Sequence, residues 1–465
     1  MLQIPQHLTP RDLRALASAY PDRYPVLFDS VSQGALARWT VLSIACGAAL
    51  WIDSARQLHS RDVPTPAAAG FLDSFDAWWR HEQTSSAAVE AGPWRSGWAV
   101  FLGYELAAEI EPSLHFPTGP EGCLGFALRT PAALVFDHRE DRCWALAEPG
   151  HQRLLADLQA HVPKANARFQ SVSQLDTRIS DGDPESLLHP GSLQESSRAE
   201  FIAGVQRAQA YIAAGDIYQV NLARRWNARL ALHVSAAHIY ERLRIANPAP
   251  FGCRAQFAGL DIHSSSPERL LHIANGEINT RPIAGTRPRH ASSDRDAAQK
   301  GELLANPKER AEHVMLIDLE RNDLGRVCMP GSIEVSEFMS VESFAHVHHI
   351  VSNVRGRLRN DVTPIGALRA IFPGGTITGC PKIRCMKIIA ELEVQGRGVY
   401  TGSLGWIGRD GSADFNILIR TLCVQDRELS FRAGCGIVAD SIPELELQET
   451  RAKARGLLQA LGEAA

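Results

Sequence analysis

Residues 197–222, the stretch that decides the fold, read SRAEFIAGVQRAQAYIAAGDIYQVNL. Ser197 is a good helix-capping residue, and the apolar side chains after it recur every three to four positions, as on one face of a helix. Gly215 is typical of a helix end. The residues that follow alternate like a strand, with Gln219 and Asn221 on one face and apolar side chains on the other. Helices and strands therefore both build this half of the chain.

The same two patterns continue toward the C-terminus. Strand-like runs lie near residues 254–284, 402–420 and 428–438. Helical patterns lie near residues 307–325, 363–371, 381–393 and 443–461. Strands that come in runs separated by helices, without regular alternation, predict an α+β fold with mostly antiparallel sheets and flanking helices.

Composition excludes several classes of protein. The chain has 465 residues, 45% hydrophobic and 22% charged, with a net charge of −4, so nucleic acid is not an expected partner. Residues 1–20 have no apolar signal core. The longest apolar run, residues 41–52, is shorter than the ~20 residues that cross a bilayer. Nine scattered cysteines without a CxxC pair indicate reduced thiols, so we expect a cytoplasmic protein without membrane attachment.

The length suggests one large intertwined unit or two lobes, because single domains usually have ~100–200 residues. Residues 171–197 are polar and rich in Ser, Asp, Gly and Pro, which is typical of a linker. We therefore predict an N-terminal lobe at 1–170, a linker at 171–197 and a catalytic domain at 198–462.

Two predicted helices each carry carboxylates three residues apart. Glu309 and Glu312 share a face, as do Glu446 and Glu449, and Lys453 follows one turn later. The simpler interpretation is that these are solvated faces with ion pairs. If all four carboxylates converged on one cleft, they would need a cation, and oxygen ligands of this kind select Mg²⁺. The sequence alone leaves open whether the two helices meet.

Two further charged residues are candidates for catalysis or binding. Glu268 ends a predicted turn, 264–268, and is a candidate general acid or base; the alternative is an acid at the start of a helix. Arg420 ends an apolar strand, 416–420, which suits a bidentate clamp on a carboxylate; the alternative is a strand-end charge that reaches water.

Glycine-rich segments and histidines complete the candidates. Residues 282–286 and 373–379 are expected to be turns whose N–H groups can hold an anion, although most such segments are only turns. Residues 433–437 follow a strand and could hold an anion in the same way. His346, His348 and His349 form a cluster without the ligand spacing of a zinc site. One of the three is a candidate acid or base, and the other two are expected to be structural.

Taken together and in order, these segments resemble the chorismate-utilising synthases, a family that includes anthranilate, aminodeoxychorismate, isochorismate and salicylate synthases. The resemblance covers nearly all of residues 197–462. It rests on the segments GDIYQVNL (215–222), SPE (266–268), RPIAGT (281–286), ERAEHVMLIDLERNDLGRV (309–327), FPGGTITGCPK (372–382) and GCGIVADS (434–441). Residues 27–30 and 102–105 extend it more loosely into the first half. It implies that the sheets pack as a sandwich.

The resemblance also implies site residues. Glu309, Glu312, Glu446 and Glu449 match a Mg²⁺ cluster, with Glu312 and Glu449 as direct ligands. Glu268 matches the acid that helps the C4 hydroxyl of chorismate to leave, and His349 and Thr376 match residues that line the ring site. The remaining matches surround the substrate and are Gln219, Gly285, Thr286, Tyr400, Arg420, Gly434, Gly436 and Lys453.

The nucleophile depends on one position. Gln219 stands where the isochorismate and salicylate synthases carry a lysine that activates water, so the resemblance implies ammonia as the nucleophile. The chain contains no amidotransferase domain of its own. The ammonia is therefore expected from a separate glutamine amidotransferase subunit, component II.

Sequence features of two forms of the family are both present, and the two forms aminate different carbons of chorismate. The variants YQVNL, SPER, PGGTITG, VHH and DFNILIR resemble component I of aminodeoxychorismate synthase, which acts in p-aminobenzoate and folate synthesis. Ala284 stands against this, because many such enzymes have a lysine there that attacks C2, whereas the anthranilate form has alanine. We expect amination at C4. The first alternative is an anthranilate synthase component I, which aminates C2, and the second alternative is an inactive chorismate-binding homologue.

The resemblance implies an effector pocket in the first half. The anthranilate enzymes bind tryptophan through Leu-Leu-Glu-Ser and Asn-Pro-x-Pro-Tyr-Met motifs. Here they read LFDS (27–30) and NPAPFG (247–252), which places Ser30, Pro250 and Phe251 in an altered pocket, with plain core packing as the alternative.

Overall fold

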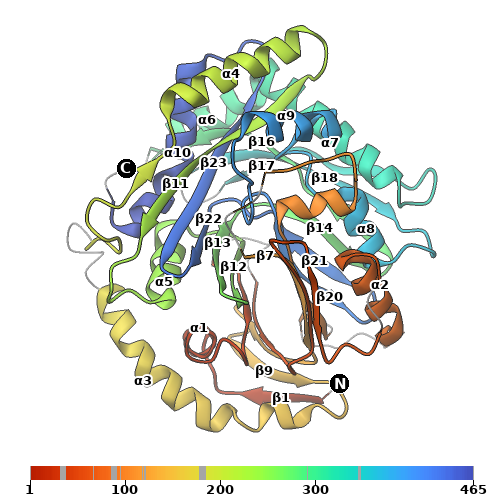
Figure 1. Ribbon diagram of the computed structural model, residues 1–465, viewed down its shortest axis with the longest axis vertical. Coiled ribbons are helices and arrows are strands. Elements are labelled where there is room, and N and C mark those ends of the chain that lie inside the picture. Colours follow the sequence, from red (N-terminus) through yellow and green to blue (C-terminus); the bar gives the residue numbers. More distant parts are fainter. Residues whose placement is uncertain are drawn as a thin grey trace.

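The computed structural model describes residues 2–31, 38–65, 68–84, 92–94, 96–117, 119, 122–176, 185–290, 292–343 and 347–463. Within them the chain forms two large sheets, and every strand pairing is antiparallel. Helices cover the outside of both (Figure 1). This confirms the α+β prediction.

The first sheet joins both halves of the chain. In spatial order its strands are β1 (Leu2–Gln6), β9 (Arg142–Ala147), β8 (Ala132–Asp137), β3 (Trp39–Ile44), β2 (Val26–Asp29), β12 (Phe251–Phe257), β13 (Leu260–Ser266), β22 (Thr421–Gln425), β23 (Glu428–Ile437), β11 (Gln219–Arg229) and β10 (Gln194–Glu195), and β19 (Gly379–Cys380) also pairs with β11. The two halves meet where β2 pairs with β12.

The second sheet is also shared between the halves. Its strands are β16 (Ile283–Pro288), β18 (Val347–Arg357), β15 (Glu277–Thr280), β14 (Arg269–Ala274), β21 (Ala413–Asn416), β20 (Ser403–Gly408), β6 (Gly97–Leu102), β7 (Cys123–Thr130), β4 (Ala49–Asp53) and β5 (Leu58–Arg61), and β17 (Glu334–Ser343) pairs with β18. Both sheets contain strands from before and after residues 171–197. The division of the chain into an N-terminal lobe, a linker and a catalytic domain therefore stays a prediction. Helix α3 (Leu158–Asp176) extends into the predicted linker, and residues 177–184 lie outside the described residues.

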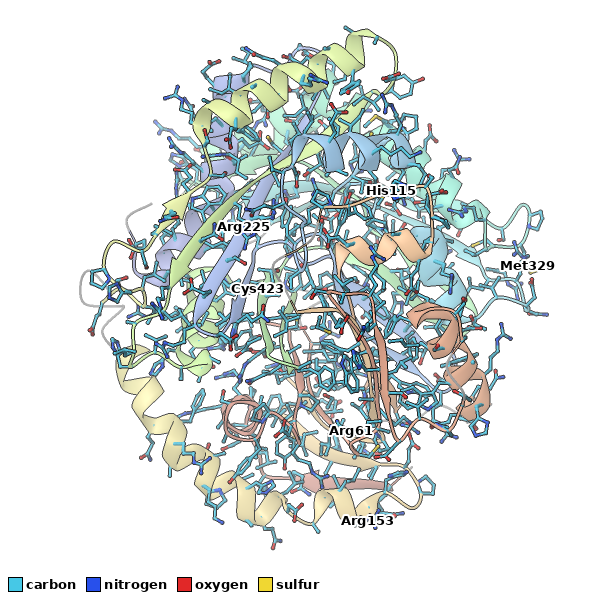
Figure 2. All side chains as sticks on the ribbon, in the orientation of Figure 1. Arg61, His115, Arg153, Arg225, Met329 and Cys423 are labelled. Atoms are coloured by element: carbon cyan, nitrogen blue, oxygen red, sulfur yellow. The ribbon has the colours of Figure 1, made fainter. Side chains whose placement is uncertain are left out.

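The sheets pack against each other through an apolar layer. One cluster of buried side chains combines Phe101 and Phe126 of the second sheet with Ile262 of the first. The rings of Phe126 and Phe257 lie 5.3 Å apart across the interface. Buried aromatic side chains contribute about 1.5–3 kcal/mol each by leaving water, so this layer fixes how the sheets sit together. Side chains fill the interior, where Cys423 lies, whereas Met329 projects from the edge (Figure 2).

Ten helices in the described part of the chain surround the sandwich (Figure 1). They are α1 (Pro10–Ala19), α2 (Phe71–Glu82), α3, α4 (Arg198–Ala213), α5 (Ala236–Ala246), α6 (Ser293–Ala305), α7 (Pro307–Gly325), α8 (Pro364–Ile371), α9 (Lys382–Leu392) and α10 (Pro443–Leu461), with short 3₁₀ turns at Tyr104–Glu109 and Gln152–Leu155. None of the helices described has the length and apolar character needed to cross a membrane.

Local structure departs from the sequence predictions at several glycine-rich segments. Residues 282–286 are not a turn, because most of them belong to β16, which has a bulge at Gly285. Residues 433–437 do not follow a strand but lie within β23, which matches the strand-like run predicted at 428–438. A bulge keeps a strand in its ladder while it redirects neighbouring groups, which a turn cannot do.

Arg420 also lies in a different context from the one predicted. Strand β21 ends at Asn416, because the backbone of Leu418 bonds to Thr401 and Gly402 instead of continuing the ladder. Arg420 then adopts a left-handed backbone with φ of +53° before β22 begins. It is therefore a residue of a connection, not of a strand.

Candidate active site

A cavity of about 930 Å³ lies where β11, β16, β18, β23, α7 and α10 approach one another. Side chains far apart in the sequence line it. Fifteen residues predicted to form the site are among them: Gln219, Glu268, Ala284, Gly285, Glu309, Glu312, His349, Thr376, Tyr400, Arg420, Gly434, Gly436, Glu446, Glu449 and Lys453. The fold therefore brings both carboxylate pairs and the acid/base candidates to one place.

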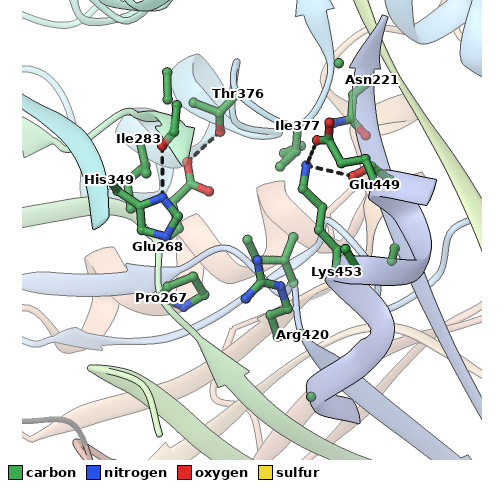
Figure 3. A pocket seen from close by; sticks show the side chains of 18 of the residues that line it. Asn221, Pro267, Glu268, Ile283, His349, Thr376, Ile377, Arg420, Glu449 and Lys453 are labelled. Atoms are coloured by element: carbon green, nitrogen blue, oxygen red, sulfur yellow. Dashed lines mark hydrogen bonds and ion pairs between the residues drawn. The ribbon is translucent and has the colours of Figure 1, made fainter. Parts of the chain in front are cut away.

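Glu268 forms part of one wall. It follows β13 directly, and its side chain is 5% exposed. Thr376 Oγ1 donates a 2.6 Å hydrogen bond to Glu268 Oε1 (Figure 3). Burial raises the pKa of Glu268 to about 7, against the opposing effects of that hydrogen bond and of the positive charges of Lys453 and Arg420. The carboxyl group is therefore protonated over a range in which an ordinary glutamate is ionised, which suits a general acid. The alternative, an acid at a helix start, is wrong, since β14 follows.

His349 lies on the same side of the cavity (Figure 3). Its Nδ1 lies 3.1 Å from the Gly285 carbonyl oxygen, which can only accept, so Nδ1 carries the proton and Nε2 is the acceptor nitrogen. Burial lowers the pKa of His349 to about 4. The ring is therefore neutral near pH 7. His348 is buried between Ser343 Oγ and Asp296 Oδ1, at 2.8 Å from each, whereas His346 lies outside the described residues.

Five cationic residues are among the described residues that line the cavity: Arg287, Arg420, Arg432, Lys453 and Arg455. No side chain in the described residues forms a hydrogen bond or ion pair with the Arg420 guanidinium, which lines the cavity (Figure 3). Lys453 Nζ lies 2.7 Å from Glu449 Oε1 and donates to the Gly434 carbonyl oxygen at 3.1 Å. Burial lowers the pKa of Arg420, although an arginine stays charged at neutral pH. A charged guanidinium without a partner is suited to bind an anionic ligand.

Glycines line the opposite wall because other side chains occupy the space beside them. A Cβ added to Gly436 would collide with Gln219 Nε2. A Cβ added to Gly434 would lie 2.8 Å from both Asn221 Oδ1 and Tyr400 Oη. Both glycines lie in β23 opposite β11, so the wall is flat backbone bordered by two amides and a phenol.

The four carboxylates line the cavity, and three of them are already hydrogen-bonded or ion-paired to other side chains of the protein. Glu309 accepts a 3.0 Å bond from Arg287, Glu312 accepts one of 2.9 Å from Gln219, and Glu449 pairs with Lys453. Burial raises the pKa of Glu312, and the charges of Glu309 and Glu449 raise it further.

The arrangement of these carboxylates bears on metal binding. Among the described residues no three His, Cys, Asp or Glu side chains are close enough together to hold a metal ion as they stand. The donor set nevertheless fits Mg²⁺, because carboxylate oxygens from two helices face one cavity and repel one another. Binding a cation requires Lys453 or Arg287 to release its carboxylate.

The remaining predicted residues lie elsewhere. Ser30 Oγ donates to the Pro250 carbonyl oxygen at 2.9 Å, and the guanidinium of Arg269 lies 4.8 Å from the ring centre of Phe251. These contacts lie outside the set of described residues that line the cavity. The Thr286 side chain lies outside the described residues, although its backbone pairs with His349.

Several residues at the site were missed by the sequence analysis. Asn221 and Arg287 line the cavity. Glu105 acts from the first half: it accepts hydrogen bonds from the backbone N–H groups of Arg397 and Gly398, in the loop that carries Tyr400. The available signals were the alternation that places Asn221 beside Gln219 and the resemblance at residues 102–105. Neither of these sequence features predicts a contact between residues that are far apart in the sequence, such as Glu105 and Arg397.

The site can bind a small dianion beside a neutral acid. Arg420 and Lys453 carry positive charge, the glycine wall leaves room for a flat ring, and Glu268, with a pKa of about 7, can donate a proton. Four carboxylates at the same cavity supply oxygen ligands for a divalent cation.

Comparison with known proteins agrees with this geometry. The family model for chorismate binding enzymes matches residues 33–459. The chain is 40% identical to anthranilate synthase component 1 of Streptomyces coelicolor, over 86% of this chain and 79% of that protein. It is 38% identical to aminodeoxychorismate synthase component 1 of Bacillus subtilis, over 84% and 82%. The crystal structure of anthranilate synthase component I from Streptococcus pneumoniae superposes with a TM-score of 0.72 at 30% identity, covering 91% of this chain and 93% of that one. The chain belongs to the chorismate binding enzyme family.

Proposed function

We propose that this protein is the synthase component of a two-component system that aminates chorismate at C4, giving 4-amino-4-deoxychorismate for p-aminobenzoate and folate synthesis. The reaction consumes one ammonia and releases one water: a C–N bond forms, the C4–O bond breaks, and the hydroxyl leaves with a proton. Glu268 is the proposed donor of that proton.

The buried carboxyl group of Glu268 is the observation that carries the proposal. It lies at the wall of a cavity whose cations suit a dianion, and its pKa of about 7 leaves a proton on about half of the molecules at pH 7. Hydroxide is a poor leaving group unless a proton is supplied, so the acid has a direct purpose in the reaction. Thr376 orients the carboxyl through its 2.6 Å hydrogen bond.

We propose Mg²⁺ as the cofactor, held by Glu312 and Glu449 with Glu309 and Glu446 around them. Bound there, Mg²⁺ would neutralise the ring carboxylate of the substrate. Arg420, Tyr400 and the backbone of Gly434 and Gly436 would hold the rest of the substrate. Lys453, released from Glu449, would then be able to approach a substrate carboxylate.

The choice of C4 rests on motif variants along the chain, and one relative of similar length is an aminodeoxychorismate synthase. Ala284 lines the cavity and has no group that attacks C2. The proposed C4 amination therefore proceeds without a covalent enzyme intermediate at this position.

The second candidate is amination at C2, which yields anthranilate, pyruvate and water from chorismate and ammonia. Ala284 favours it, as does the 40% identity to an anthranilate synthase component 1. In either case the names of the relatives as component 1 support a glutamine amidotransferase partner as the source of ammonia.

A product assay tests the proposal. The purified chain is incubated with chorismate, Mg²⁺ and ammonium at high pH, with and without aminodeoxychorismate lyase, and the products are separated by chromatography. We expect p-aminobenzoate only when lyase is present, and chorismate consumption by Glu268→Gln at least about 100-fold below that of the wild type. Anthranilate formed without lyase would replace C4 with C2 amination, and a wild-type chain that consumes no chorismate would indicate an inactive homologue.

A further inference from the structure

One buried arginine behind the cavity bonds to several separate segments of its wall. Arg397 is 2% exposed and lies in the connection between α9 and β20. Its guanidinium donates to the side chains of Glu393 and Thr401 and to the carbonyl oxygens of Asn221 and Ile377. These contacts use every N–H group that a guanidinium has. The side chain therefore holds together segments that are far apart in the sequence.

Part of this network takes the place of a strand beside β11. On the edge of β11 away from β23, β19 pairs with the first two residues and β10 with two residues near the other end. Between them, no strand of the described chain pairs with that edge. There Arg397 donates to the Asn221 carbonyl oxygen at 2.8 Å, and Glu393 Oε1 accepts from the Ala223 N–H at 3.0 Å. The ion pair thus supplies the donor and the acceptor that a neighbouring strand would supply.

The same guanidinium reaches the segment that orients the proposed acid. Arg397 Nη1 donates to the Ile377 carbonyl oxygen at 2.9 Å, and Thr376, the preceding residue, donates to Glu268 Oε1 at 2.6 Å (Figure 3). A planar fork of N–H groups fixes direction as well as distance. Arg397 therefore connects the backbone of β11 to the peptide whose neighbour holds Glu268.

Contacts from the first half of the chain hold the backbone at Arg397. The backbone N–H groups of Arg397 and Gly398 both donate to the carboxylate of Glu105. The guanidinium lies 4.9 Å from the ring centre of Tyr104. Because Glu105 binds the backbone, a substitution of the arginine side chain leaves these two bonds in place. The loop that carries Tyr400 should therefore keep its position when only the fork is changed.

We propose that Arg397 is a positioning residue, which holds Glu268 at a fixed place relative to the wall that β11 forms. Arg397 is not among the described residues that line the cavity, so it acts through Ile377 and Thr376. A general acid must meet the leaving oxygen within hydrogen-bond reach, and a displacement of about 1 Å can cost about 100-fold in rate. The inference rests on the proposed role of Glu268 and adds the group that places it.

The test is Arg397→Lys, which keeps the positive charge beside Glu393 but replaces the planar fork by a single ammonium group. Activity is measured with chorismate, ammonium and Mg²⁺. We expect kcat to fall about 10- to 100-fold, because Glu268 is displaced from the leaving oxygen. The Michaelis constant for chorismate should change less than about threefold, since the substrate-binding groups stay in place.

The pH profile separates positioning from a general loss of structure. The hydrogen bond from Thr376 opposes the effect of burial on the pKa of Glu268. If Arg397→Lys loosens that bond, the pKa of Glu268 should rise, and the alkaline decrease of kcat/KM should move to a pH above about 7. The other charged groups that act on Glu268 are the same in the variant: Lys453, Arg420 and Glu320.

Arg129→Lys is the matched control. Arg129 is also a buried arginine, 5% exposed, and its guanidinium bonds to Glu82, Glu148 and the Gly97 carbonyl oxygen, away from the cavity lining among the described residues. It should unfold at lower urea than the wild type but keep the wild-type kcat, Michaelis constant and pH profile. Wild-type kcat in Arg397→Lys overturns the inference. So does a rise in the Michaelis constant that accounts for the whole loss of kcat/KM.

Glu393→Gln keeps the proposal testable if Arg397→Lys does not fold. The amide oxygen can still accept from the Ala223 N–H, but an uncharged side chain holds Arg397 less firmly. Its kcat should fall by a smaller factor and its pH profile should move in the same direction. Wild-type values of both in this variant would count against the inference.

A further readout does not depend on turnover. In NMR spectra of protein with isotope-labelled glutamate, the carboxyl signal that Glu268→Gln lacks should titrate near pH 7 in the wild type. Its midpoint should be higher in Arg397→Lys and unchanged in Arg129→Lys. If the wild type consumes no chorismate, the proposed function fails, while this titration still decides whether Arg397 positions Glu268. One common midpoint in all three proteins would show that it does not.

Discussion

Glu268→Gln should lower activity and raise stability, and the size of the gain in stability depends on pH. Burial raises the pKa of Glu268 from 4.5 to about 7. A difference of this size corresponds to about 3 kcal/mol between the folded and unfolded states. Below pH 4.5 the carboxyl is protonated in both states and costs nothing. As pH rises from 4.5 to about 7, the unfolded chain releases this proton while the folded chain holds it, so the wild type progressively loses this stability, and the loss is complete above about pH 7.

Glutamine removes the ionisation but keeps an oxygen that accepts from Thr376. At pH 8 the free energy of unfolding of Glu268→Gln should therefore exceed that of the wild type by up to about 3 kcal/mol, and at pH 4 the two should agree. Urea unfolding at both pH values measures this. Chorismate consumption by the variant should fall at least about 100-fold, since it has no proton to give.

The matched control is Glu428→Gln on β23, whose side chain is 67% exposed and should unfold like the wild type at both pH values. The wild-type kcat/KM should fall as pH rises through about 7, because the free enzyme then loses the acid proton. A Glu268→Gln variant that is no more stable than the wild type at pH 8, or that keeps its activity, would refute the assignment of Glu268 as a buried, protonated acid.

Further predictions concern the other groups. Arg420→Leu should weaken chorismate binding about 10- to 100-fold in equilibrium binding, as expected for a charge-assisted hydrogen bond; unchanged affinity would mean that the guanidinium faces no substrate. Glu312→Gln should raise the Mg²⁺ concentration for half-maximal activity at least about tenfold after removal of metal by EDTA, whereas an unaltered titration would exclude it as a ligand. The ring signals of His349 in NMR spectra should shift only as pH falls toward about 4, and a transition near 6.5 would contradict its burial. Glu105→Gln should lower the free energy of unfolding by about 1–3 kcal/mol in urea, because an amide nitrogen would face the backbone N–H of Arg397 or Gly398.

Local patterns predicted much of the secondary structure. The cap at Ser197 holds, since its side chain accepts from Glu200 N, and α4, α7, α8, α9 and α10 lie within a residue or two of the expected ranges. These signals are local, because a cap and a 3.6-residue repeat act within a few residues. Arg420 escaped prediction because its backbone follows hydrogen bonds from Leu418 to the distant residues Thr401 and Gly402.

The burial and the hydrogen-bond partners of each candidate residue could not be predicted from the sequence. Gln219 looks like an ordinary polar residue of an alternating strand, yet it is 5% exposed, because α7 and β23 cover its face and Glu312 bonds to its amide. Glu449 supports both interpretations of the carboxylate pairs. It forms the i,i+4 ion pair with Lys453 that a solvated face predicts, and it also lines the cavity.

The sequence by itself determined the classes of element and the mostly antiparallel α+β fold, because periodicity and caps are local properties, and its resemblance to the family indicated fifteen of the residues that line the cavity. Only the tertiary structure decided that helices α7 and α10, some 130 residues apart, present their carboxylates to the same cavity. It also decided that the pKa of Glu268 is raised to about 7 and that the pKa of His349 is lowered to about 4, so the imidazole ring is neutral near pH 7. A pKa depends on how much water and charge surround a group, and the packing of distant segments sets both.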